Sequence, residues 1–176
     1  MRYNELTFQG RNAVLEAFRS GKTIDKLFIL DGCQDGPIKS IVREAKKTDA
    51  IINYVDKERL DRLAGTGHHQ GVVAIGAAYE YAEVEDILAA AKEKGEDPFI
   101  FILDEIEDPH NLGAIIRTAN LAGAHGVIIP KRRAVGLTAT VAKTSAGAIN
   151  YTPVAKVTNI SQTIEELKKQ GLWFVC

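Results

Sequence analysis

The feature that most constrains the fold is a strand, helix and strand pattern in the middle of the chain. Residues 99–103 form a near-continuous apolar run, followed by an acidic loop that ends at Pro109. An amphipathic helix is predicted over residues 111–122, and residues 127–129 are the next apolar run. Apolar strands joined by a helix are typical of a parallel sheet that is covered on both faces. The pattern therefore predicts an α/β fold with a mainly parallel sheet.

Hydrophobic periodicity divides the chain into two α/β domains and a linker. We expect the domains to be residues 1–77 and 98–176, with residues 78–97 as a linker that contains one surface helix. In the first domain, the predicted helices cover residues 12–19, capped by Asn12, 37–47, and 57–63, capped by Asp56, and the predicted strands cover 26–30, 51–55 and 72–75. In the second, helices are also predicted over 137–146 and 161–170, and strands over 152–157 and 172–176. The last of these, LWFVC, would be a buried strand with no following helix, which favours a domain that continues past residue 176.

The composition is that of a packed globular protein. Of the 176 residues 45% are hydrophobic, and no run approaches the roughly 18 apolar residues that a membrane helix needs. The first residues, MRYNELTFQGRN, lack the apolar core and cleavage site of a secretion signal, so a cytoplasmic location is expected. Cys33 and Cys176 fit no zinc-ligand spacing, so we expect reduced cysteines and no metal site.

Charge is unevenly distributed along the chain although the net charge is only −1. Residues 80–108 carry eleven acidic residues and two lysines, whereas residues 109–164 carry no Asp or Glu. The cations of that second stretch are Arg117, Lys131, Arg132, Arg133, Lys143 and Lys156. A locally positive surface of this kind favours a phosphate-bearing partner, and chance composition around buried strands is the alternative.

The start of the helix after the first apolar run is the candidate reactive site. Asn111, Gly113, Arg117 and Thr118 are spaced for one end of one helix, at the edge of the sheet where α/β proteins usually bind ligands. Gly113 would let a ligand or another backbone come close. Arginine stays protonated near neutral pH, so Arg117 alone would bind phosphate, position and polarise. The alternative is that Arg117 pairs with the acidic linker and Asn111 merely caps the helix.

A Gly-rich loop before residue 72 is a second candidate. His68, His69 and Gln70 lie between glycines, where imidazole and amide groups could contact RNA. Adjacent histidines rarely share a metal, so the remaining alternative is an uninvolved turn.

Further candidates lie in the carboxylate-free stretch. Lys131, Arg132 and Arg133 form a basic corner after a strand, and Lys143, Ser145 and Gly147 are plausible contacts that could equally be plain helix surface. The sequence has no G-x-G-x-x-G or G-x-S-x-G motif, and the glycine spacing before Lys143 does not complete a P-loop. Rossmann redox chemistry, serine hydrolysis and nucleotide hydrolysis therefore lack their motifs.

The segment DPHNLGAIIRTANLAGAHGVIIP closely resembles the first signature of the SpoU-type branch of the SPOUT RNA methyltransferases, N-x-G-x-x-x-R-T. The segments GRNAVLEAF and HHQGVVA resemble the beginning and end of that family's ribosomal-protein-like substrate-binding domain, and AKTSAGAINYTPVAKVTNI resembles its catalytic domain. The resemblance spans essentially the whole chain.

The resemblance implies methyl transfer from S-adenosylmethionine to a ribose 2′-hydroxyl, most like methylation of a guanosine in bacterial large-subunit ribosomal RNA. It implies a homodimer, a knotted C-terminal cofactor pocket, activation of the hydroxyl by Arg117 and a supporting role for Asn111. Contacts to ribosomal RNA are expected from Arg11, Asn12, His68, His69, Gln70, Lys131, Arg132, Arg133 and Lys143, and contacts to the cofactor from Gly113, Ser145 and Gly147.

Two later signatures of the family, a Gly-Ser-Glu-Gly loop and a Ser-Leu-Asn segment, do not occur in the chain. The sequence therefore predicts an N-terminal part of a ribose methyltransferase, inactive by itself, with the RNA-recognition domain, half of the catalytic site and little of the cofactor pocket. The competing hypothesis is a non-catalytic RNA-binding protein made of the same two modules.

Overall fold

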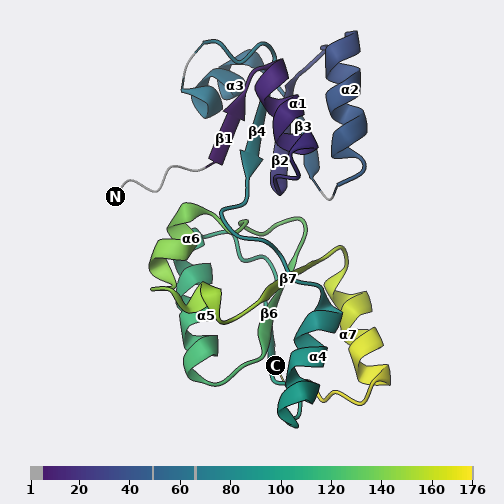
Figure 1. The fold of residues 1–176 in the computed structure, drawn as a ribbon, viewed down its shortest axis with the longest axis vertical. Coiled ribbons are helices and arrows are strands. Elements are labelled where there is room, and N and C mark those ends of the chain that lie inside the picture. The colour runs from purple at the N-terminus through teal and green to yellow at the C-terminus, as the bar shows by residue number, and fades with distance from the viewer. Residues whose placement is uncertain (1–5, 49, 66, 176) are drawn as a thin grey trace. The chain divides into compact units, whose positions relative to one another are not determined.

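The computed structural model describes residues 6–48, 50–65 and 67–175. The chain divides into two compact units, residues 1–79 and 80–176. Each unit has its own sheet and its own helices (Figure 1). The two units are therefore described separately.

The first unit is built on a mixed four-stranded sheet. Its strand order is β1 (Leu6–Gln9), β4 (Val72–Gly76), β2 (Ile24–Leu30) and β3 (Ile51–Val55). The β2–β3 pair is parallel, whereas β4 is antiparallel to both β1 and β2. Alternate residues of the central strands face opposite sides, because side chains along a strand alternate.

Helices cover both faces of this sheet. The helices α1 (Arg11–Arg19) and α2 (Gly36–Ala45) pack over a core that includes Leu27 and Ile29, whereas α3 (Lys57–Ala64) packs over Phe28 and Val73. The predicted Asp56 cap of α3 is confirmed, since its side chain accepts a hydrogen bond from the Arg59 amide at 2.7 Å.

Two predictions for the first unit fail at its start. The strand β1 was not predicted, because four residues with an exposed Leu6 and Thr7 give no clear hydrophobic alternation. Asn12 does not cap α1, since the helix begins one residue earlier and Gly10 occupies the capping position. Gly10 adopts a φ of 87°, a conformation that favours glycine and lets the chain turn directly from β1 into α1.

The second unit is built on a parallel three-stranded sheet, as predicted. Its strand order is β5 (Ile100–Ile102), β6 (Gly126–Pro130) and β7 (Val154–Val157). The helices α5 (Pro109–Leu121) and α6 (Ala139–Thr144) lie on one side of the sheet, and α4 (Val84–Lys94) and α7 (Ile160–Lys169) lie on the other (Figure 1). A 3₁₀ turn, η1 (Ala148–Asn150), precedes β7.

The predicted surface helix before the second sheet is α4, and it does more than connect two domains. Its outer face is exposed, but Ile87 and Ala91 are fully buried. Ile87 packs with Ile128, Ala155 and Leu167 in the core of the second unit. Residues 84–94 therefore form part of that unit.

The predicted strand at residues 172–176 is wrong for the residues that the structure describes. Residues 172–175 have no strand partner, and Cys176 lies outside the described residues. Leu172 and Phe174 pack against the core beside α7, whereas Trp173 and Val175 are 97% and 98% exposed. The segment is apolar, but a strand also needs a neighbour for its backbone hydrogen bonds. In the described parts of the chain, no helix is long and apolar enough to cross a membrane.

Candidate functional site

The loop after β5 leads into the longest helix in the described chain, α5. Pro109 occupies the first helical turn, where its missing N–H costs nothing. The Asp108 carboxylate caps the helix by accepting hydrogen bonds from the His110 amide at 2.6 Å and the Asn111 amide at 3.2 Å. The helix therefore begins at the carboxyl edge of the parallel sheet, where the sequence placed the reactive site.

Asn111 and Arg117 project from this helix into solvent. Both are exposed, and neither side chain has a hydrogen bond or ion pair with another described residue. The structure excludes the two purely structural roles considered for these residues. Asp108 rather than Asn111 caps the helix, and Arg117 does not pair with the acidic segment before it. Both side chains are thus free to contact a ligand.

The sequence suggested that Asn111 and Arg117 lie at the same end of the helix. In the structure they do not. Asn111 lies in the first turn and Arg117 in the second half of the 13-residue helix. With 1.5 Å rise and 100° of rotation per residue, they are about 9 Å apart along the axis and about 120° apart around it. A ligand that contacts both must therefore extend along the helix.

Gly113 provides a close contact between helices. It is buried, and a β-carbon there would lie 1.9 Å from the Thr144 Oγ1 and 2.9 Å from the Val141 carbonyl oxygen of α6. The Thr144 hydroxyl also donates to helix carbonyl oxygens, including that of Thr140 at 2.9 Å. Of the two roles considered for Gly113, the structure shows the approach of another backbone.

The other two residues expected to contact the cofactor differ in accessibility. Ser145 is fully buried, and its hydroxyl donates to the Ala142 carbonyl oxygen at 2.9 Å within the same turn. Gly147 is half-buried, begins η1 with a φ of 88°, and accepts a hydrogen bond from the Asn150 side chain on its carbonyl oxygen. Neither contributes a free side-chain donor or acceptor.

The basic residues of the second unit have different surroundings. Arg133 forms an exposed ion pair with Glu105 at 3.0 Å, so its charge is partly neutralised. Lys156 lies over the Tyr81 ring, 4.2 Å from its centroid, and donates to the Tyr81 hydroxyl at 3.1 Å. Arg132 and Lys143 are exposed, and neither has a partner among the described residues, whereas Lys131 is half-buried and has one. The positive surface predicted for this stretch is therefore smaller than its composition indicates.

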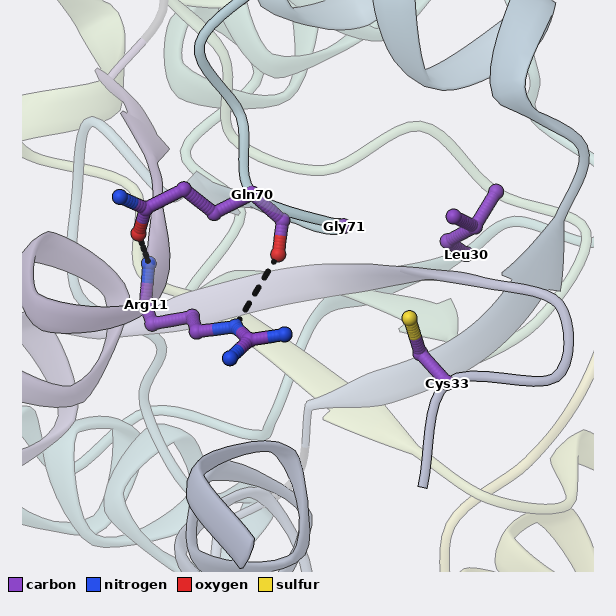
Figure 2. A pocket seen from close by; sticks show the side chains of 5 residues that line it. All are labelled: Arg11, Leu30, Cys33, Gln70 and Gly71. Atoms are coloured by element: carbon purple, nitrogen blue, oxygen red, sulfur yellow. Dashed lines mark hydrogen bonds between the residues drawn. The ribbon is translucent and has the colours of Figure 1, made fainter. Parts of the chain in front are cut away.

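In the first unit, Arg11 and Gln70 interact although they are 59 residues apart. The Gln70 side-chain oxygen accepts a hydrogen bond from the Arg11 amide at 3.1 Å, which caps α1 where Gly10 cannot. The Arg11 Nε donates to the Gln70 carbonyl oxygen at 3.2 Å (Figure 2), and the guanidinium forms an ion pair with Asp35. Hydrogen bonds from Arg11 to Gln70 thus join the two segments predicted to contact RNA, and they hold the Arg11 side chain in place. Asn12 is exposed in the first turn of α1.

The two adjacent histidines have opposite environments. His68 is exposed, whereas His69 is 5% exposed. The His69 Nδ1 accepts a hydrogen bond from the Gly71 amide at 3.0 Å, so its Nε2 carries the hydrogen that reaches Asp61 at 2.9 Å. His69 therefore holds the loop in place, and only its neighbours His68 and Gln70 remain exposed for a ligand.

We expect His69→Ala to destabilise the protein by about 2 to 3 kcal/mol, because it removes a buried ring and leaves the Gly71 amide without an acceptor. The matched change His68→Ala, at an exposed position, should cost less than about 0.5 kcal/mol. Urea unfolding of both variants measures the difference. Equal losses of stability would contradict the buried role of His69.

Comparison with known proteins agrees with this geometry. Residues 9–82 match a family model described as RNA 2′-O ribose methyltransferase substrate binding, and residues 98–176 match the SpoU rRNA Methylase family. The chain is 54% identical over 166 residues to YacO of Bacillus subtilis, whose name assigns it to the TrmH family of tRNA/rRNA methyltransferases. That match covers 94% of this chain and 66% of YacO.

A second curated relative gives the same family. A Staphylococcus haemolyticus protein, also named for the TrmH family of tRNA/rRNA methyltransferases, is 48% identical over 96% of this chain and 68% of its own length. The crystal structure of the SpoU methyltransferase AviRb from Streptomyces viridochromogenes with AdoMet is 20% identical, with a TM-score of 0.45 over 97% of this chain and 60% of that chain. The chain spans about two thirds of the length of the curated relatives it matches. On the sequence identity to these relatives, the chain belongs to the SpoU/TrmH family of RNA methyltransferases.

Proposed function

We propose that the protein methylates the 2′-hydroxyl of a ribose, in a guanosine of large-subunit ribosomal RNA. The observation that carries the proposal is the order of the two family matches in one chain. Residues 9–82 match the substrate-binding domain of RNA 2′-O ribose methyltransferases, and residues 98–176 match the SpoU rRNA Methylase family. Guanosine as the target rests on the resemblance of the motifs alone.

The proposal divides the work between the two units. The first unit recognises RNA, with His68, Gln70 and the fixed guanidinium of Arg11 on its surface. The second unit presents Asn111 and Arg117 to the reacting nucleotide. Arg132 and Lys143 of the second unit are exposed cations that would add phosphate contacts without reading the sequence.

Arg117 is proposed to hold the reacting ribose. Methylation requires the 2′-hydroxyl to lose its proton, and an arginine is a poor acceptor for that proton because it is already protonated. Its planar guanidinium can instead bind a phosphate of the same RNA strand and stabilise negative charge that develops on the 2′-oxygen. A neighbouring phosphate oxygen would then accept the proton. The free and exposed side chain of Arg117 supports this role.

The residues that the sequence suggested for S-adenosylmethionine do not fit that group. The space beside Gly113 is filled by α6. The Ser145 hydroxyl is buried and donates a hydrogen bond to the Ala142 carbonyl oxygen. Gly147 supplies only backbone, and its carbonyl oxygen is already engaged. The family uses this methyl donor, but the chemistry assigned here to the described residues is confined to binding and orienting RNA.

The direct test uses a version of the protein that spans the full length of its curated relatives. It measures transfer of tritium from methyl-labelled S-adenosylmethionine to transcripts of large-subunit ribosomal RNA, with transfer RNA as the comparison. The proposal predicts label in the ribosomal transcript and little in transfer RNA. Label in transfer RNA alone would contradict the substrate. RNA binding without any transfer would instead support the competing hypothesis of a non-catalytic RNA-binding module.

A further inference from the structure

A groove lies between α2 and the end of β3 on the first unit. It is lined by none of the residues that the sequence predicted to contact RNA or the cofactor. It has a volume of about 410 Å³. Ile38 and Val42 of α2 supply its apolar lining, and Tyr54 of the edge strand β3 lines it as well. We call this cavity the α2 groove.

Three cations lie along the α2 groove. Lys39, Arg43 and Lys46 recur at four- and three-residue intervals, which places them on one face of the helix, and all three are exposed. The nearest acidic group is Glu44, 3.8 Å from the Arg43 Nε. Glu44 is engaged by Lys47, whose hydrogen bonds at 2.9 and 3.0 Å lower the pKa of its carboxyl.

Most of the positive charge of the α2 groove is therefore not neutralised by the protein. Lys39 and Lys46 have no ion-pair partner in the described parts of the chain. Cations about one helical turn apart can each meet a phosphate, and a row of them favours a polyanion over a single small anion.

Tyr54 adds an aromatic surface to this row of cations. Its side chain is 56% exposed, although tyrosine rings are usually better buried. A ring in a positively charged groove is the arrangement that stacks on the unpaired bases of single-stranded nucleic acid. A base inside a duplex is already stacked on both faces and cannot use such a ring.

The α2 groove continues towards the residues already proposed to contact RNA. Cys33 lines it and also lines a second cavity of about 430 Å³, together with Arg11, Leu30, Gln70 and Gly71. Figure 2 shows the Cys33 sulfur and the Arg11 guanidinium on this second cavity. The two cavities thus share Cys33 as a lining residue, which places the α2 groove next to the cavity lined by Arg11 and Gln70.

We propose that the α2 groove binds an unpaired segment of the RNA substrate. Phosphates would lie along Lys39, Arg43 and Lys46, a base would stack on Tyr54, and the strand would continue past Cys33 towards Arg11. The inference rests on the proposed function for its choice of RNA as the polyanion. It adds a single-strand site on the first unit to the residues of the second unit that are proposed to hold the reacting nucleotide.

The test is fluorescence anisotropy with the whole chain and two labelled probes, a 12-nucleotide oligouridylate and a 12-base-pair RNA duplex of mixed sequence. Tyr54→Ala should weaken oligouridylate binding about tenfold and leave duplex binding within about twofold. Tyr54→Phe keeps the ring and should bind oligouridylate like the parent protein.

The charge contribution is tested with two triple variants that remove the same number of cations. Changing Lys39, Arg43 and Lys46 to glutamine should weaken oligouridylate binding at least tenfold, and should reduce the slope of log affinity against log salt by about 2. Changing Lys57, Arg59 and Arg62 of α3, on the other face of the sheet, should leave affinity within about threefold.

A second measurement reports on the shared position directly. Saturating oligouridylate should slow the alkylation of Cys33 by iodoacetamide at least fivefold, as read by mass spectrometry of the peptide that contains it. The free thiol of Cys33 is half-buried at the junction of the two cavities.

The outcomes separate this inference from the proposed function. Oligouridylate binding that is equally weakened by the α2 and α3 triple variants would overturn the groove and leave RNA methylation standing. Equal losses of duplex and oligouridylate binding in Tyr54→Ala would overturn the single-strand site. Absence of binding to either RNA by the parent protein would count against the proposed function itself and the groove with it.

Discussion

Replacing Arg117 with alanine, in a version of the protein that spans the full length of its curated relatives, should lower the rate of methyl transfer at least a hundredfold while leaving RNA affinity within about threefold. Removing one group that stabilises developing charge in a reaction typically costs two to three orders of magnitude in rate. Binding should change little, because Arg117 is one exposed cation among several and no described residue depends on it. Single-turnover transfer of labelled methyl groups at saturating RNA isolates the rate from binding.

Two further variants make the Arg117 result specific. Arg117→Lys keeps the charge but loses the planar fork that binds phosphate through two hydrogen bonds, so it should recover only part of the rate. Lys169→Ala, which removes an exposed cation from α7 on the opposite side of the sheet, should leave the rate unchanged. Unimpaired turnover by Arg117→Ala would remove this residue from the mechanism.

Replacing Gly113 with alanine should destabilise the protein by about 2 kcal/mol, although alanine ordinarily favours a helix by about 1 kcal/mol over glycine. The added methyl group would lie 1.9 Å from the Thr144 Oγ1 and 2.9 Å from the Val141 carbonyl oxygen. The backbone carbonyl cannot rotate away as a side chain can, so α5 and α6 must separate. Chemical unfolding monitored by circular dichroism measures the loss.

A double-mutant cycle with Thr144→Ala tests whether this contact is the cause. Removing the Thr144 hydroxyl takes away the nearest atom, so the two changes together should cost at least about 1 kcal/mol less than the sum of the single changes. Gly36→Ala is the control, because a β-carbon there meets nothing within 4 Å and its φ is not positive. Additive effects of Gly113→Ala and Thr144→Ala would contradict the contact.

The sequence predicted those elements whose signals are local. The parallel sheet of the second unit followed from two apolar runs joined by a helix, and Asp56 capped α3 because the cap and the amide that it accepts from lie three residues apart. Residues 172–175 show the limit of such signals. Their apolar run predicted a buried strand, but only Leu172 and Phe174 of these described residues pack against the core, and whether a strand forms depends on a partner elsewhere.

Features that depend on distant residues were not accessible from the sequence. The cap of α1 comes from Gln70, 59 residues away, so the nearby Asn12 was the wrong choice. His68 and His69 look equivalent in sequence, and only the fold shows that one is buried against Gly71 and Asp61. Gly113 could face a ligand or a helix, and the position of α6 decided between them.

The sequence also does not show which charged side chains pair with one another and which stay unpaired. The carboxylate-free stretch drew attention to Arg117, whose side chain is exposed, but Arg133 is paired with Glu105 and Lys156 lies against Tyr81. The sequence did not mark the cations of the α2 groove as a site, because Glu44 lies between Arg43 and Lys46 along the chain. Helical geometry separates the two, because Lys39, Arg43 and Lys46 share one face while Glu44 turns to Lys47.

The position of the transferred methyl group tests the proposed 2′-O-methylation of guanosine most directly. Alkaline cleavage of RNA requires a free 2′-hydroxyl beside the broken phosphodiester, so a 2′-O-methylated nucleotide remains joined to its neighbour. After transfer of tritiated methyl groups to large-subunit ribosomal RNA and complete alkaline hydrolysis, the account predicts label in an alkali-resistant dinucleotide that begins with guanosine. Label recovered in mononucleotides, which places the methyl group on a base, would contradict it.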